Sequence, residues 1–521
     1  MMNAVGRMAR CAGAPLRSLL RPGFGLGVFL GLLFFFCQLP DVSTYPLVNA
    51  DEALLNDPGL QLVRRGEFRS DVFRMLPGYA DFYFWQPPGL ALSAACCYKV
   101  MGFGIWQTRL PGIGFGALAV SLCYFLARRI SGSNRAALFS AVLLCLWPPF
   151  VLTSKAARMD TGAISLLLAA TLLVVADVQG EARTTRRLFA AGVLCGCAGL
   201  FHPISINWAG CLFVLLLVDA RTGLRSVAMF VLGGTLPVLA WLGFAWRHPD
   251  AFGQQFLEEL FGRTAGGSLM GRFAAEASRY AGELARYPML ALCVLLAAVG
   301  FVNRRAWTHS GVCRLLSLCC LLALAHAATA GKASGFYTLY PMTLLLCLVG
   351  IGVDLLLTHL EGGRASTAGI LAVRACFGAL LINGFLFAYA PRVAARVFQH
   401  KEREYWSMVR PLSERLRPGD RIWGSAVLWY AAVRSGAGLD SQPEPVPAAW
   451  MTRPDPGIQR FVVVDGDLGR RSFPGYEKVA EIRAELPRVR GYQFSDRSYA
   501  FDIYESTILR LQLGRQGEKS Q

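Results

Sequence analysis

A series of apolar runs fills the first three quarters of the sequence and strongly restricts its fold. Most of them are close to the about 20 residues with which a helix crosses a hydrocarbon core of about 30 Å. Because only helices and closed barrels satisfy the backbone inside lipid, we predict a polytopic α-helical membrane protein with about eleven spans. The expected spans cover residues 24–40, 109–130, 134–152, 162–178, 188–203, 206–218, 226–246, 287–302, 315–329, 336–357 and 369–390.

Basic residues set the expected orientation of these spans. Four arginines precede the first run and place the N-terminal segment 1–23 in the cytoplasm by the positive-inside rule. The basic turns 128–135, 183–187, 221–225 and 304–314 also become cytoplasmic if the apolar stretch 87–104 lies along the outer face as a helix. The loops 41–108, 153–161, 247–286 and 330–335 then face outward, as does the chain after residue 391. We expect a multi-pass protein of the plasma membrane, the inner membrane in a bacterium.

The composition changes near residue 402, where the long apolar runs stop and Pro, Gly and charged residues become frequent. This change divides the chain into a transmembrane domain, 24–401, and a water-soluble domain, 402–521, which the same topology places outside the cytoplasm. We expect short buried strands at 421–424, 461–465 and 500–504, and helical or mixed stretches at 428–434 and 476–486. The prediction is a small extracytoplasmic α/β domain. Nothing in it resembles a catalytic constellation.

The formal net charge of +18 is mainly explained by basic residues that mark the cytoplasmic turns. No recognisable module supports binding to nucleic acid. Topology does not require the arginines of the outer loops, which suit either anionic lipid phosphate or ordinary lipid headgroups. The 15 cysteines lie mostly within apolar runs and lack metal-site spacing in a polar context. The cysteines are therefore interpreted as small buried hydrophobic residues. We predict no cofactor, and no obligatory divalent metal because Gln86 stands where a His or Lys could have assisted one.

An acidic pair, Asp51-Glu52, stands in the first outer loop. A solvated surface pair is the plain interpretation. The same loop continues with the aromatic residues 82–85, Gln86 and a Pro-Pro break, a combination suited to the membrane interface. A carboxylate pair in such a loop also suits chemistry on a substrate that the membrane presents.

Three further segments place polar residues at the outer ends of expected spans. Asp160 either caps a helix or meets Asp51 across the bundle, since acids at the membrane boundary are costly and commonly functional. His202 is either a packing residue or a partner of phosphate or carboxylate. The remaining residues are interfacial anchors or phosphate ligands: Arg158, Lys332, Tyr337 and Tyr340.

The order of these motifs, together with the Arg-Leu-Pro-Gly segment that begins at Arg109, resembles one branch of the GT-C glycosyltransferases. It is the dolichyl-phosphate-mannose protein mannosyltransferase-like branch, which includes the bacterial aminoarabinose transferases of lipid A. The resemblance covers residues 24 to about 390 and, more loosely, the C-terminal domain. It implies a membrane glycosyltransferase that moves a hexosyl or pentosyl group from a polyprenyl monophosphate to an extracytoplasmic lipid, glycan or protein. The transfer would invert the configuration at the anomeric carbon. The protein itself would be in contact with membrane lipids.

The resemblance also implies roles for individual residues. Asp51 becomes the catalytic carboxylate, because an acceptor hydroxyl needs a base as its bond to carbon forms. Glu52 would support Asp51 or the acceptor, and Asp160 would be the second acid. The departing phosphate needs cationic help, for which the candidates are Arg158, Lys332, Tyr337 and Arg109. Three residues would line the site: His202, Gln86 and Tyr340.

One departure from the family pattern and two other functions complete the predictions. Gln86 stands where many members carry His or Lys before Pro-Pro, so we expect no phosphate or metal role there. A transporter or flippase for a lipid-linked substrate would explain the many spans, but the sequence shows no internal repeat to support it. An oligosaccharide ligase or polymerase would use a diphosphate donor, and the sequence does not separate it from the transferase.

Overall fold

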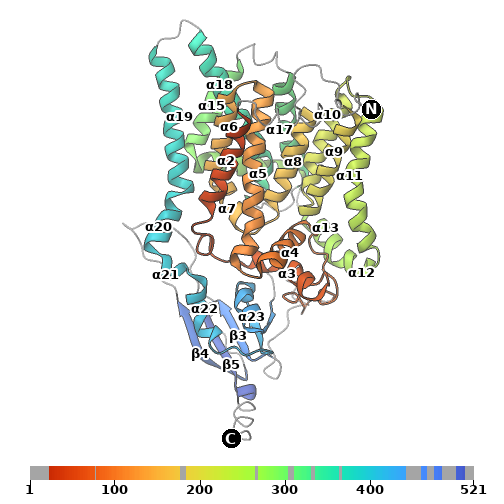
Figure 1. Cartoon of the computed structure of the whole chain (residues 1–521), viewed down its shortest axis with the longest axis vertical. Helices are drawn as coiled ribbons and strands as arrows, with labels where there is room; N and C mark the ends of the chain where they lie inside the picture. The colour runs from red at the N-terminus through yellow and green to blue at the C-terminus, as the bar shows by residue number, and fades with distance from the viewer. Residues whose placement is uncertain are drawn as a thin grey trace, which may run out of the picture.

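A bundle of roughly parallel helices forms most of the computed structural model (Figure 1). The structure describes residues 23–74, 76, 78–175, 184–264, 268–302, 310–329, 335–362, 367–441, 459–465, 474–483 and 500–510. Every apolar run predicted from the sequence overlaps one or two helices of the bundle. These helices are α2 (Phe24–Gln38), α5 (Ile105–Ser131), α6 (Asn134–Leu146), α7 (Pro148–Lys155), α8 (Asp160–Val175), α9 (Thr185–Phe201), α10 (Ser205–Val218), α11 (Leu224–Ala245), α15 (Pro288–Val302), α17 (Ser310–Thr329), α18 (Leu339–Gly362) and α19 (Thr367–Ala388).

The number of spans stays a prediction. Among the described residues, 5 helices are long and apolar enough to cross a membrane, or up to 7 if each of two bent helix pairs is one span. Four shorter apolar helices are α2, α4 (Gly89–Met101), α8 and α10. The structure therefore confirms a polytopic helical architecture but not the count of about eleven.

One expected span, 134–152, is broken into two helices. The chain bends by 62° between α6 and α7. Trp147 lies at the bend with φ −82° and ψ 113°, an extended conformation that is usual before proline, and Pro148 begins α7. The bend matters for the site because α7 leads directly into the turn that carries Arg158.

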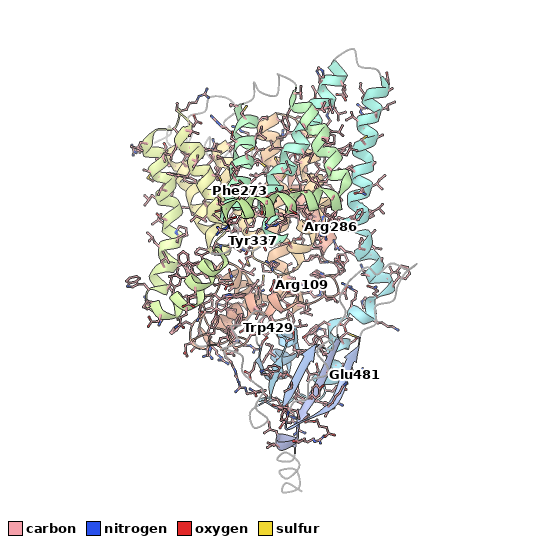
Figure 2. The ribbon with its side chains drawn as sticks, turned by 180° about the vertical axis from the view of Figure 1, so that it is seen from behind. Arg109, Phe273, Arg286, Tyr337, Trp429 and Glu481 are labelled. Atoms are coloured by element: carbon pink, nitrogen blue, oxygen red, sulfur yellow. The ribbon has the colours of Figure 1, made fainter. Side chains whose placement is uncertain are left out.

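Several helices cover the end of the bundle that faces the C-terminal sheet. Figure 1 places α3 (Ala50–Arg65) and α4 there. The helix predicted within 87–104 is thus present as α4, while its side of the membrane stays a prediction. Figure 2 shows α14 (Leu269–Arg286) running across the bundle between the labels Phe273 and Arg286. The remaining short helices are α12 (Pro249–Phe252), the π-helix η1 (Gly253–Leu257), α13 (Glu258–Thr264), the 3-10 helix η2 (Gly335–Thr338), α20 (Ala390–Phe398) and α21 (His400–Arg403).

The C-terminal region contains a five-stranded sheet with the strand order β2-β1-β3-β5-β4. β1 pairs in parallel with β2 and β3, and β5 pairs antiparallel with β3 and β4. The elements are α22 (Tyr405–Ser413), β1 (Arg421–Gly424), η3 (Ala426–Leu428), α23 (Trp429–Ser435), β2 (Gly438–Asp440), β3 (Phe461–Asp465), β4 (Tyr476–Arg483) and β5 (Ala500–Ser506).

Two details of this sheet differ from the sequence prediction. The stretch 476–486, predicted as helical or mixed, is strand β4 over residues 476–483. Its Glu, Lys and Ala residues are poor strand formers, but pairing with β5 outweighs that preference. The short strand β2 has no counterpart in the prediction, because its three residues are too few to show a pattern.

The C-terminal sheet shares one hydrophobic core with helices α3 and α4. Leu54 of α3 and Tyr98 of α4 belong to the same buried cluster as Tyr405, Ile422 and Trp429 of the C-terminal region. Figure 2 shows Trp429 at this junction. The C-terminal domain therefore packs directly against the helix that begins with the acidic pair.

Candidate active site

The N-terminus of α3 directs its two acidic residues differently. Asn49 caps the helix, and its side chain accepts a hydrogen bond from the Glu52 backbone N–H at 3.2 Å. The Asp51 side chain is 45% exposed, whereas the Glu52 side chain is fully buried. Negative residues are favourable at this end of a helix. The pair thus offers one carboxylate to a substrate and directs the other into the protein.

Glu52 is the centre of an enclosed polar group. Its Oε1 accepts a hydrogen bond from Arg109 Nη2 at 2.5 Å, and its Oε2 accepts from Arg109 Nε at 3.0 Å and from the Tyr430 hydroxyl at 3.1 Å. Arg109 Nη1 donates to the carbonyl oxygens of Val42 and Pro46 at 2.7 and 2.9 Å. The Arg109 side chain is fully buried, and all three of its guanidinium nitrogen atoms contact protein acceptors. Its binding of donor phosphate stays a prediction.

Arg158 brings together the two acids that we expect to meet across the bundle. Its Nη1 donates to Asp51 Oδ2, and its Nε donates to Asp160 Oδ2 at 3.1 Å. Burial lowers the pKa of the guanidinium, but Asp160 and Asp51 more than offset this effect and raise its pKa overall. Arg158 therefore stays charged and holds the half-exposed Asp51 to the fully buried Asp160.

A cluster of aromatic and histidine side chains lies beside Arg158 and Asp160. The ring centroid of His202 is 5.7 Å from that of Tyr337 and 6.1 Å from that of Tyr340. Tyr340 is also 5.9 Å from His326. Tyr337 lies close to Arg158, and Tyr340 lies close to Asp160. The structure thus joins the predicted residues His202, Tyr337 and Tyr340 into one group; Figure 2 shows Tyr337 within the bundle and Arg109 nearer the sheet.

His326 is a member of this group that the sequence predictions missed. It is a lone histidine within the apolar run of α17, and that isolation was the one available signal. Its Nδ1 contacts the Leu322 carbonyl oxygen at 3.1 Å. Because a carbonyl only accepts, Nδ1 carries the proton and Nε2 of the neutral ring is an acceptor.

Three buried acceptors at these positions have no hydrogen-bond partner among the residues that the structure describes. They are Asp160 Oδ1, His326 Nε2 and Gln86 Oε1. Buried polar atoms are almost always hydrogen-bonded in native proteins, so acceptors of this kind are typical of a place that receives water or a hydroxylated ligand. The segment that follows Gln86 packs closely against the end of α9, since a Cβ at Gly89 would lie 2.7 Å from the Leu200 carbonyl oxygen.

Two predictions have no structural test. Lys332 lies outside the described residues, so its phosphate-binding role stays a prediction. Within the described ranges, no three His, Cys, Asp or Glu side chains are grouped as a metal site would require. The expectation of no obligatory metal also stays a prediction.

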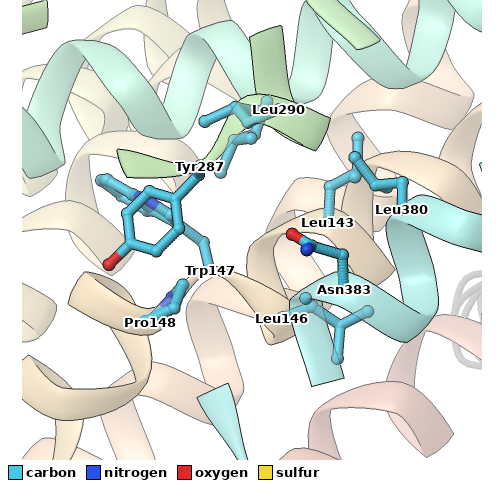
Figure 3. Close-up of a pocket in the computed structure, with 10 residues that line it drawn as sticks. Leu143, Leu146, Trp147, Pro148, Tyr287, Leu290, Leu380 and Asn383 are labelled. Carbon is cyan, nitrogen blue, oxygen red and sulfur yellow. The ribbon is translucent and has the colours of Figure 1, made fainter. Parts of the chain in front are cut away.

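An apolar pocket lies where α6 bends into α7 (Figure 3). It is formed by α6, α7, α15, α18 and α19 and includes about 370 Å³ of empty space, counting its open side. Leu143, Tyr287 and Leu380 line it, and the polar side chain of Asn383 points into it. Most of the residues that line the pocket are apolar.

Comparison with known proteins agrees with this architecture. Residues 85–245 match the family model of dolichyl-phosphate-mannose-protein mannosyltransferase. The crystal structure of ArnT from Cupriavidus metallidurans bound to undecaprenyl phosphate is similar over 92% of this chain and 97% of its own, with a TM-score of 0.58 and 15% sequence identity. Residues 85–245 are thus similar to this mannosyltransferase family, and the chain has the GT-C fold.

Other GT-C structures extend the likeness beyond one enzyme. The mycobacterial arabinofuranosyltransferase AftD aligns with 93% of this GT-C chain and 40% of its own, with a TM-score of 0.55 and 16% identity. The Archaeoglobus fulgidus oligosaccharyltransferase in its apo form aligns with 86% of this chain and 69% of its own, with a TM-score of 0.51 and 12% identity. Curated proteins gave no match to the sequence. The fold is therefore shared across enzymes whose names denote different sugars.

Proposed function

We propose that this GT-C protein transfers a hexosyl or pentosyl group from a polyprenyl monophosphate to an acceptor on the extracytoplasmic side, with inversion. The observation that carries the proposal is the bridge formed by Arg158. It holds an exposed carboxylate and a buried carboxylate together, although Asp51 and Arg158 are 107 residues apart in the chain. A base beside a fixed positive charge is what glycosyl transfer from a phosphate requires.

Asp51 is the base in this proposal. In the reaction, the bond from the anomeric carbon to the phosphate oxygen breaks while the acceptor oxygen bonds to the opposite face of that carbon. The acceptor proton passes to Asp51, whose side chain is exposed enough to reach it. Glu52 fixes the first turn of α3, and Asp160 keeps Arg158 in place. All three predicted acids thus remain in the proposed site: Asp51 acts on the acceptor, while Glu52 and Asp160 position other residues.

The departing phosphate requires positive charge and hydrogen-bond donors. We assign this task to Arg158, Tyr337 and Lys332, with His202, Tyr340 and Gln86 lining the sugar. Arg109 is assigned to Glu52 instead, because its Nε, Nη1 and Nη2 all contact protein acceptors in a buried setting. No step of the proposed mechanism uses a metal ion.

The polyprenyl chain needs an apolar path that leads to the phosphate. The pocket at the α6–α7 bend supplies one, since α7 runs from Pro148 at the pocket to Lys155, three residues before Arg158. A helix rises about 1.5 Å per residue, so the length of α7 between the pocket and the turn before Arg158 is short relative to a polyprenyl chain. The likeness to ArnT bound to undecaprenyl phosphate supports a donor of this class.

An oligosaccharide ligase that uses a diphosphate donor is the second candidate. The likeness to the Archaeoglobus fulgidus oligosaccharyltransferase favours it. Incubation of the purified protein with a cell-envelope extract as the source of acceptors, and with synthetic polyprenyl-monophosphate or polyprenyl-diphosphate sugars as donors, separates the two functions. We expect release of polyprenyl monophosphate from the first donor class. Turnover of the diphosphate donors alone would replace the proposal with the ligase, and turnover of neither would reject both.

A further inference from the structure

The turn between α7 and α8 contains a residue in a backbone conformation that its side chain disfavours. Ala157 has φ +47° and is the one residue other than glycine with a positive φ among those that the structure describes. It is fully buried and immediately precedes Arg158. A left-handed conformation is unfavourable for a residue with a Cβ, so surrounding contacts must hold it in place.

Asn56 makes the contact that holds this turn. Its Nδ2 donates to the Ala157 carbonyl oxygen at 3.1 Å and to the Glu52 carbonyl oxygen at 2.9 Å. The side chain is fully buried. The orientation of the amide is determined by its surroundings, because the opposite orientation would place Oδ1 against two carbonyl oxygens. Asn56 thus joins the helix that carries Asp51 to the turn that carries Arg158.

We infer that Asn56 is a positioning residue, which keeps Ala157 left-handed and thereby places Arg158 between Asp51 and Asp160. The inference rests on the proposed function for its catalytic meaning, while the contact between Asn56 and the turn is independent of it. Asp at this position would set a carboxylate against two carbonyl oxygens, and Ala would remove both hydrogen bonds. Neither would hold the turn.

A glycine at residue 157 provides a specific test, because glycine adopts positive φ without the penalty of a Cβ. Four proteins form a double-mutant cycle: wild type, Asn56→Ala, Ala157→Gly and the double variant. We expect Asn56→Ala to lower the rate of sugar transfer by about tenfold to a hundredfold, since small displacements of catalytic groups have effects of this size. We expect Ala157→Gly to restore the rate to within about threefold of wild type in the double variant.

Ser140→Ala is the matched control. Ser140 is also fully buried, and its hydroxyl also serves a carbonyl one turn back and a distant one, Ala136 at 2.9 Å and Cys347 at 2.9 Å. Its loss should lower the Tm as Asn56→Ala does while leaving the transfer rate within about twofold of wild type. If Asn56→Ala does not accumulate as folded protein, Asn56→Ser takes its place in the cycle.

The outcomes separate this inference from the proposed function. The Tm of all four proteins in detergent measures the coupling without any substrate, and we expect Ala157→Gly to raise Tm more in the Asn56→Ala background than in wild type. A double variant no more active and no more stable than Asn56→Ala overturns the inference. Full activity of Asn56→Ala also overturns it. An inactive wild type with coupled Tm values rejects the proposed function and leaves Asn56 as the residue that holds the turn.

Discussion

At the scale of single residues, the Arg158 guanidinium holds the acidic side chains of the candidate site together. Its planar fork contacts a carboxylate on either side, Asp51 and Asp160, from separate nitrogen atoms. Only arginine combines a permanent charge with several donors in a fixed plane. A lysine ammonium has three donors but only one nitrogen, so it cannot reach both carboxylates from separate positions as Nε and Nη1 do. The site therefore depends on guanidinium geometry as well as on charge.

Replacement of Arg158 by lysine tests this dependence. Arg158→Lys keeps the charge but loses one charge-assisted hydrogen bond, worth about 1.5–3 kcal/mol, which corresponds to a fall in kcat of about tenfold to a hundredfold. Steady-state transfer kinetics measure the effect. Arg65→Lys is the control, since Arg65 is 46% exposed and pairs with Asp71 at the other end of α3. Equal kinetics in the two variants would show that charge alone suffices at position 158.

At the scale of elements, the first turn of α3 is fixed from two sides. Arg109 of α5 and Tyr430 of α23 both contact the Glu52 carboxylate. Tyr430 is fully buried and stacks against Phe103 with ring centroids 5.5 Å apart. Since Asp51 is the neighbour of Glu52, the C-terminal domain takes part in positioning the proposed base.

The variant Tyr430→Phe removes only the hydroxyl that reaches Glu52. We expect kcat to fall by about tenfold, the equivalent of one hydrogen bond to a charged group, with little change in the KM of the donor. Tyr405→Phe is the matched control, because the Tyr405 hydroxyl is equally buried but donates to Val427 inside the C-terminal domain at 2.9 Å. A similar loss of kcat in both variants would assign the effect to general destabilisation of that domain.

At the scale of the whole molecule, one end of the bundle carries α3, α4 and the C-terminal sheet (Figure 1). Arg158 also lies at this end, because it contacts Asp51 of α3. We propose that this end faces outward from the cytoplasm. The opposite end then holds the turn after α5, with Arg128 and Arg129 at the last turn of the helix. A single orientation thus satisfies the positive-inside rule and brings the site to the outer surface.

Cysteine labelling in intact cells tests that orientation. On a background without reactive native cysteines, a cysteine at Ser131 should be protected from an impermeant maleimide, and one at Glu414 should react. Glu414 is a suitable outer position because its side chain is 60% exposed in the C-terminal domain. Ser334, which the topology also places outside, lies beyond the described residues. Labelling of Ser131→Cys without labelling of Glu414→Cys would show that the protein has the opposite orientation.

The sequence was sufficient to predict the helices and to single out residues that the fold brings together, because each of these leaves a local pattern. Hydropathy locates the spans, and a boundary charge such as Asp51, Arg158 or Asp160 stands out against apolar neighbours. Tyr430 and Asn56 could not be predicted, since their importance comes from contacts with Glu52 and Ala157 that only the fold creates. The contact between Arg109 and Glu52 could not be predicted either, because the sequence shows the charge of Arg109 but not its burial beside Glu52.

Sugar transfer by the Asp51→Asn variant is the most direct test of the account. Asparagine keeps the size of the side chain but cannot accept the acceptor proton, so we expect a loss of at least about a hundredfold in kcat, with Tm and donor binding near those of wild type. Asp81→Asn, in the same outer loop and exposed, should retain full activity. Full activity of Asp51→Asn, in a protein that transfers sugar from polyprenyl monophosphate, would contradict the assignment of Asp51 as the base.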